Sequence, residues 1–297
     1  MKAMKTLSFI VVLSIFLGVS SIASQIGGSL ALKDQTVLIA GYDDAAENTD
    51  VLLVASYNSD QNTVSLLQIP RDTYFKHGHG QNKINQLYSS LVYSGVDSET
   101  AMRRLTENIS EALGITIDGF IGVSTDLFSE AIDALDGFFV DLPDEVVIYD
   151  ASGRIMKKYP KGNNFLNGND ALTLARNRKG YISADIGRLD VQTVMIKGFF
   201  ERLKDGITYP QGLKLFRVLG KANTDLSITY ALRMLLGNLD KISKSNLFIL
   251  RLPGQPDTIN GVSYFIADKD NARKIVLENF KDFNGVFDPQ KALELDR

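Results

Sequence analysis

The 297-residue chain contains no cysteine, no tryptophan and only two histidines. Without thiols it can form neither a disulfide framework nor a cysteine-ligated zinc site. The two histidines, His77 and His79, lie in a glycine-rich loop, and we expect them to be solvent-exposed and to bind no metal. A net charge of −3 and a pI near 5.5 argue against a nucleic-acid partner, because such proteins usually carry a basic domain. The chemistry left open is phosphate chemistry performed by arginine and aspartate side chains.

Charged residues are also missing from most of the N-terminal segment. Lys2 and Lys5 precede an almost uninterrupted apolar run over residues 7–23, and apolar character continues to residue 32. A helix of about 20 apolar residues spans a bilayer, and preceding lysines favour a cytoplasmic N-terminus. We therefore expect a cytoplasmic tail (1–6), a transmembrane signal-anchor (7–32) and an extracellular domain (33–297) at the cell membrane. Cleavage of a signal peptide after Ala23 is the alternative.

The rest of the chain alternates short apolar runs with helical patterns. The runs at residues 36–41, 50–57 and 64–69 are typical of buried strands, and residues 98–113 carry apolar side chains at helical spacing. The same patterns predict further strands at 115–123, 138–142, 146–149 and 247–252, and helices at 127–135, 171–176, 185–203, 211–219, 228–242 and 267–280. The two strands around Pro143 are expected to form a hairpin, and Asn167 is expected to cap a helix. The prediction is one α/β domain (α+β mixed) in three layers, with helices flanking a central mixed sheet.

Two aspartates flank the loop between the first two predicted strands. Asp43 follows one strand and Asp50 opens the next. Carboxylates at adjoining strand ends can share a hard cation such as Mg²⁺. The alternative is that they are turn-forming, solvated side chains.

Several cations follow at predicted strand and helix ends. Arg71 comes after a buried strand and a proline, at the kind of strand end where α/β sheets bind ligands, although an ion pair with Asp72 is the alternative. Lys83 lies in a polar segment nearby. Arg176 and Arg178 point about 200° apart on a helix but the same way on an extended chain. Their convergence on one phosphate therefore predicts a helix break between them.

A third polar group lies on one face of the predicted helix at 185–203. Asp185, Arg188 and Gln192 are spaced i, i+3 and i+7, and apolar Ile196 and Phe199 continue the same stripe. Burying such polar groups is costly without partners. Either a ligand or an Asp185–Arg188 ion pair would supply them, and the sequence leaves both open.

Taken together, these motifs resemble the LytR–CpsA–Psr family of membrane-anchored bacterial cell-wall enzymes. The resemblance extends from about residue 35 to 280. The motifs that carry it are Gly41-x-Asp43, Asp50, Ile69-Pro70-Arg71-Asp72-Thr73, Lys83-Ile84-Asn85, Val140–Pro143, Leu166-Asn167-Gly168-x-x-Ala171-Leu172, Arg176-x-Arg178 and Asp185-x-x-Arg188-x-x-x-Gln192.

The resemblance implies an Mg²⁺-dependent phosphotransferase. Such an enzyme moves a glycopolymer, of the teichoic acid or capsular polysaccharide type, from an undecaprenyl-diphosphate carrier to a peptidoglycan sugar hydroxyl, and forms a phosphodiester. Asp43 and Asp50 would hold Mg²⁺ or Mn²⁺. The diphosphate would be bound by Arg71, Lys83, Arg176, Arg178, Arg188 and Gln192. Asp50, Arg71, Arg178 and Arg188 would be catalytic, and Asp185 would hold these side chains without contacting the ligand. Met102, Leu105 and Ile109 would line the family's lipid tunnel, or else form ordinary core.

The chain departs from the family pattern at several positions. Gln68 stands where many members have serine, Val191 where many have a second arginine, and Asp136 where glycine is usual. The loop before Asp50 also lacks a common arginine. These changes keep a second interpretation open, a non-catalytic or regulatory protein that binds lipid-diphosphate glycan. Hydrolysis of the carrier by water is a further possibility, and the export signal disfavours a transcriptional regulator.

Overall fold

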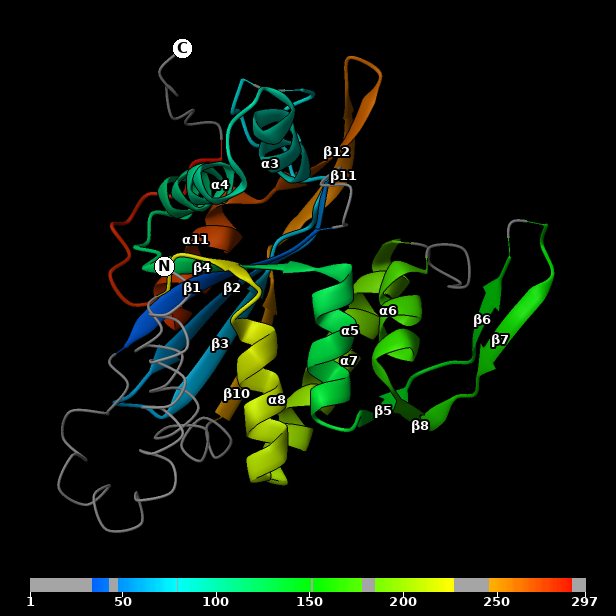
Figure 1. Cartoon of the computed structure of the whole chain (residues 1–297). Coiled ribbons are helices and arrows are strands. Elements are labelled where there is room, and N and C mark those ends of the chain that lie inside the picture. The colour runs from blue at the N-terminus through cyan, green and yellow to red at the C-terminus, as the bar shows by residue number, and fades with distance from the viewer. Residues whose placement is uncertain are drawn as a thin grey trace, which may run out of the picture.

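The computed structural model describes residues 34–42, 48–78, 80–150, 152–177, 185–226 and 246–289, with the side chains of 185–189 and 219 left out (Figure 1). The expected anchor at 7–32 and the expected helix at 228–242 lie outside these ranges. Within them, no helix is both long enough and apolar enough to cross a bilayer.

A six-stranded mixed sheet forms the centre of the domain, as predicted. Its strand order is β10-β3-β2-β1-β4-β9. Strand β1 is parallel to β4, and β3 is parallel to β10, whereas β2 is antiparallel to both of its neighbours and β9 is antiparallel to β4. The bounds are β1 Gln35–Tyr42, β2 Thr49–Asn58, β3 Thr63–Gln68, β4 Gly119–Ser124, β9 Asn223–Thr224 and β10 Asn246–Arg251. The carboxyl ends of β1, β3, β4 and β10 therefore meet at one edge, where β2 begins.

One face of the sheet carries the main hydrophobic core. Alternate strand residues, among them Leu38 and Leu52, pack under α3 (Ile84–Tyr93), α4 (Ser98–Leu113) and α11 (Lys269–Asn279). The Asp97 side chain caps α4, and Gly114 ends this helix at φ 65°. The family's implied tunnel residues belong to this core: Met102, Leu105 and Ile109 are each 0% exposed. They therefore form ordinary core packing and do not line an open tunnel.

The opposite face of the sheet is less completely covered. Ile121, Ile39 and Leu53 lie in register on neighbouring strands and are half-buried. The row continues through Gln68 on β3 to Arg251 on β10. Helices α5 (Thr125–Ala134), α6 (Gly168–Arg176), α7 (Asp185–Lys204) and α8 (Tyr209–Leu219) lie on this side (Figure 1). The predicted layers on both sides of the sheet are thus present, and the apolar row lies between sheet and helices.

Caps and close contacts fix these four helices. Ser124 caps α5, Asn167 caps α6 as predicted, and Thr208 with Gln211 forms a capping box on α8. Helix α7 crosses the two-stranded sheet formed by residues 138–142 and 162–166. The approach is so close that a Cβ on Gly198 would lie 2.3 Å from the carbonyl oxygen of Phe139. Packing of α7 on this sheet thus requires glycine at that point.

The predicted hairpin of 138–142 with 146–149 is wrong. Strand β5 (Phe138–Leu142) pairs with β8 (Gly162–Leu166), and β6 (Val146–Tyr149) pairs with β7 (Ile155–Tyr159). The chain turns later, at residues 150–154, where one carboxylate oxygen of Asp150 accepts hydrogen bonds from the backbone of Ser152 and Arg154 (2.8 and 2.9 Å). Gly153 takes φ 82°, which favours glycine. This turn chemistry outweighs the turn signal at Pro143, and the β6–β7 ribbon projects from the body (Figure 1).

A second hairpin joins β10 to α11. Strands β11 (Gly254–Ile259) and β12 (Val262–Ala267) pair with each other and not with the central sheet. The backbone of Phe265 in β12 bonds instead to that of Asp72 and Tyr74 (2.9 and 3.0 Å). The hairpin thereby lies against the segment that follows β3.

Candidate functional site

Arg71 and Asp50 form an ion pair at the carboxyl edge of the sheet. The Nη1 atom of Arg71 lies 2.5 Å from Oδ1 of Asp50, and the side chains are 15% and 44% exposed. Strand β3 ends at Gln68, and a turn after Pro70, closed by the Thr73 N–H (2.9 Å), brings Arg71 beside the start of β2. The predicted placement at a strand end, where sheets of this kind bind ligands, is confirmed.

Lys83 joins the same network through Asp72. Its Nζ lies 3.1 Å from Oδ1 of Asp72, whose Oδ2 lies 3.6 Å from Nε of Arg71. Two cations and two carboxylates thus alternate over Asp50, Arg71, Asp72 and Lys83. The sequence suggests Asp72 only as a surface ion-pair partner of Arg71, whereas the structure shows that it bridges Arg71 and Lys83.

A buried histidine contacts the backbone within the loop between Arg71 and Lys83. His77 is 3% exposed, and its Nε2 lies 2.9 Å from the carbonyl oxygen of Lys83. The expectation that this histidine is solvent-exposed is therefore wrong, because the loop folds back on itself and buries the ring. His79 lies outside the described residues.

Tyr264 packs on the outer side of this loop. Its ring centroid is 5.7 Å from Nζ of Lys83, and its hydroxyl donates to the carbonyl oxygen of Gln81 (2.8 Å). Tyr74 meets the same ring edge-on at 5.3 Å. Tyr264 belongs to the β11–β12 hairpin, and no sequence pattern near it predicts its contact with Lys83.

The predicted helix break between the two later arginines is confirmed. Helix α6 ends at Arg176, and Asn177 takes an extended conformation with φ −63° and ψ 128°. Arg176 is exposed in the last turn. Arg178 lies outside the described residues, so the convergence of the pair on one ligand stays a prediction.

Helix α7, which carries three of the predicted residues, docks on the ends of β3 and β10. Two contacts dock its first half on the sheet: Asp190 with Arg251 (2.9 Å) and the hydroxyl of Thr193 with Oε1 of Gln68 (3.2 Å). Gln192, half-buried, is adjacent to Thr193. The backbones of Asp185 and Arg188 belong to this helix. Their side chains, and the whole of Asp43, lie outside the part of the chain that the structure describes.

Val191 occupies the position where many family members carry arginine. Its side chain is 2% exposed and belongs to the apolar cluster between α6, α7 and the β5–β8 sheet. No cation projects from this position.

The described residues fit a metal that arrives with a diphosphate. Within the described ranges, no three Asp, Glu or His side chains gather as a metal cage. Asp50 contributes a carboxylate at the edge, and its predicted companion Asp43 lies beyond the described part. Mg²⁺ is commonly held by one or two carboxylates together with substrate phosphates, which matches this donor set.

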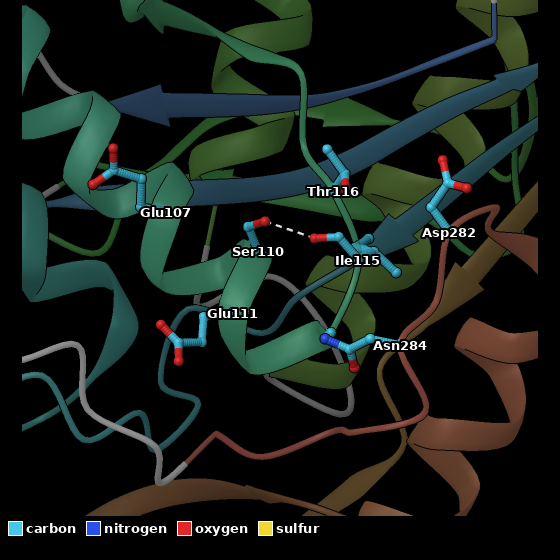
Figure 2. A pocket seen from close by; sticks show the side chains of 8 residues that line it. Glu107, Ser110, Glu111, Ile115, Thr116, Asp282 and Asn284 are labelled. Carbon is cyan, nitrogen blue, oxygen red and sulfur yellow. Dashed lines mark hydrogen bonds between the residues drawn. The ribbon is translucent and has the colours of Figure 1, made fainter.

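An open pocket of about 420 Å³ lies elsewhere, at the end of α4 before β4 (Figure 2). Ser110, whose hydroxyl donates to the carbonyl oxygen of Ile115 (2.6 Å), lines it together with Glu107, Glu111 and Asp282. Its lining holds three carboxylates and no lysine or arginine, so it would repel a diphosphate. This pocket lies at the opposite end of the sheet from Arg71, away from the ion network.

Comparison with known proteins decides the family. The sequence profile of the LytR_cpsA_psr family matches residues 20–281. The chain belongs to the LytR_cpsA_psr family. The resemblance carried by its motifs is confirmed.

Relatives of this family member match most of its length. The polyisoprenyl-teichoic acid–peptidoglycan teichoic acid transferase TagU of Oceanobacillus iheyensis is 26% identical over 244 residues, 80% of this chain and 73% of that protein. The crystal structure of Bacillus subtilis TagV is 25% identical, with a TM-score of 0.65, over 85% of this chain and 98% of TagV. The structure of TagT bound to LI-WTA is 22% identical, with a TM-score of 0.62, over 85% and 91%, and shows the shared fold.

Proposed function

We propose that this protein transfers a glycopolymer from an undecaprenyl-diphosphate carrier to a peptidoglycan sugar hydroxyl, forming a phosphodiester. The observation that carries the proposal is the Asp50–Arg71–Asp72–Lys83 network at the carboxyl edge of the sheet. The family of this chain also supports the proposal, because the chain's relatives include proteins named as teichoic acid–peptidoglycan transferases.

In this mechanism the acceptor hydroxyl oxygen bonds to the phosphorus atom next to the glycan. The bond from that phosphorus to the bridging oxygen breaks, undecaprenyl phosphate leaves, and the hydroxyl proton passes to a base. Phosphoryl transfer depends mainly on positioning and on neutralising charge at the transferring group. Arg71 and Lys83 supply positive charge, and Asp50 and Asp72 orient these cations through the contacts described above.

A divalent cation, Mg²⁺ or Mn²⁺, would add charge neutralisation at the phosphates when bound. Asp50, with Asp43, would hold it. We further propose that Arg176, Arg178, Arg188 and Gln192 complete the diphosphate site and that Asp185 supports it.

The half-buried apolar row formed by Ile121, Ile39 and Leu53 supports a lipid carrier. It lies on the sheet face that leads to the polar edge, so an apolar chain placed on it would bring its diphosphate towards Arg71. A single N-terminal anchor at 7–32, with the catalytic domain on the extracellular face, would hold the site at the membrane where such a carrier resides.

A regulatory or non-catalytic binding protein is the second candidate. It is favoured by the buried Val191, which provides no cation where many family members have arginine. Such a protein would bind the lipid-linked glycan without turnover.

The test is a reaction of the full-length protein with lipid-diphosphate glycan, peptidoglycan oligomers and Mg²⁺, followed by mass spectrometry. Transfer predicts the joined product, and its loss in a folded Arg71→Ala variant. Tight binding without product would establish the second candidate. Release of free glycan phosphate without joining would identify hydrolysis.

A further inference from the structure

Two buried hydrogen-bond donors lie side by side at the polar end of the row across the sheet. Gln68 and Arg251 are partners in the parallel register of β3 and β10. Within the described part of the chain, neither Nε2 of Gln68 nor Nε of Arg251 has a hydrogen-bond partner, and both atoms are buried. Burying a hydrogen-bond donor without an acceptor is unfavourable, so two neighbouring ones indicate a missing acceptor.

Another polar atom of each side chain is already engaged. Oε1 of Gln68 accepts from the Thr193 hydroxyl, and Nη2 of Arg251 binds Asp190. These contacts hold both side chains in place under α7. Gln68 is 2% exposed, whereas the Arg251 side chain is 36% exposed, so the pair reaches from the interior to an accessible surface.

The chemistry of the pair fits an anionic oxygen. A guanidinium N–H and an amide NH₂ are donors only, and a charge-assisted bond to a phosphate oxygen would satisfy both. Their position fits the same ligand, because Gln68 lies three residues before Arg71 at the edge where the ion network begins.

We propose that Gln68 and Arg251 bind a phosphate oxygen of the carrier diphosphate and extend its site from Arg71 to β10. The inference rests on the proposed function.

The experiment measures binding of farnesyl diphosphate with Mg²⁺ to the full-length protein by calorimetry, with circular dichroism as the folding check. Arg251→Met keeps an apolar stem and removes the donors, and Gln68→Glu replaces the donor by an acceptor. Each variant is expected to weaken binding about tenfold or more. Binding of farnesol is expected to be unchanged.

Asp190→Asn is the matched control. It weakens the ion pair that docks α7 but keeps the Arg251 cation, so we expect its dissociation constant to stay within about twofold of wild type. Equal weakening in Asp190→Asn and Arg251→Met would show that Arg251 acts only by docking α7, and would overturn the inference. A more stable Gln68→Glu variant with normal binding would also overturn it, because the side chain would then accept from Arg251 within the protein.

Arg71→Ala separates this inference from the proposed function. If Arg71→Ala binds poorly while the Gln68 and Arg251 variants bind normally, the inference alone fails. If Arg71→Ala also binds normally, the diphosphate site itself is elsewhere.

Discussion

The ammonium group of Lys83 lies 5.7 Å from the ring centroid of Tyr264, which is itself only 7% exposed. The aromatic face restricts where a flexible lysine can place its charge, and the contact contributes about 0.5–1 kcal/mol. We therefore expect Tyr264→Leu to raise KM for the lipid-diphosphate donor about two- to fivefold. Steady-state kinetics would measure this. Tyr264→Phe keeps the ring and loses only the bond to Gln81, so its KM should change less.

A double-mutant cycle would isolate this contact. If Tyr264 acts through Lys83, adding Tyr264→Leu to Lys83→Ala should have little further effect on KM. Additive effects would show that Tyr264 stabilises the loop without positioning Lys83.

Loss of the Arg71 guanidinium should abolish transfer and leave the fold intact. Its partner Asp50 is 44% exposed, so Arg71→Ala should lower the free energy of unfolding by about 1 kcal/mol or less. Arg71→Lys keeps the charge but not the planar fork, and we expect it to retain only a small part of the activity. Urea denaturation and product formation would measure the two effects. A large loss of stability in Arg71→Ala would favour a structural ion pair.

Divalent metal should act with the substrate and not with the protein alone. Because the described residues hold no group of three metal ligands, Mg²⁺ by itself should leave Tm unchanged. Mg²⁺ together with farnesyl diphosphate should raise it, and EDTA should cancel the increase and stop transfer. Differential scanning calorimetry would check this. A rise in Tm with Mg²⁺ alone would point to a preformed metal site.

Acid should weaken the contact between the start of β1 and the segment after α11. The Lys281 ammonium, which binds Asp34 directly, lowers the pKa of Asp34 from its ordinary 3.8 to about 2. A lowered folded-state pKa stabilises the protein above the unfolded value, and this contribution is lost as pH falls from about 4 to 2. Lys281→Met should therefore destabilise the protein at pH 6 but not near pH 2. Denaturation at several pH values would test this, and a constant difference would contradict it.

The two sheet faces should respond differently to truncation. Leu105 is 0% exposed in the main core, so Leu105→Ala should lower the free energy of unfolding by about 2–5 kcal/mol without changing farnesyl diphosphate affinity. Leu53→Ala, on the half-buried face, should cost less stability and weaken lipid binding. Denaturation and calorimetry would compare them. Equal binding by both variants would argue against a lipid chain on that face.

Much of the architecture could be predicted because its signals are local. Apolar runs marked the strands β1, β2, β3 and β10, and the side chain of Asn167 accepts the Asp170 N–H at the start of α6 as predicted. The pairing of β5 with β8 could not be predicted in this way. Asp150 and Gly153 form the turn that pairs β6 with β7, and β5 then pairs with the later strand β8.

The sequence by itself determined the family, through its motifs, and it excluded thiol chemistry, because the chain has no cysteine. It also determined that Arg71 lies at a strand end and that α6 stops before Asn177. Only the tertiary structure decided which side chains meet. Tyr264 contacts Lys83, and Gln68 lies beside Arg251. Strand register and the packing of distant segments produce these two contacts, and neither contact leaves a periodic pattern in the sequence.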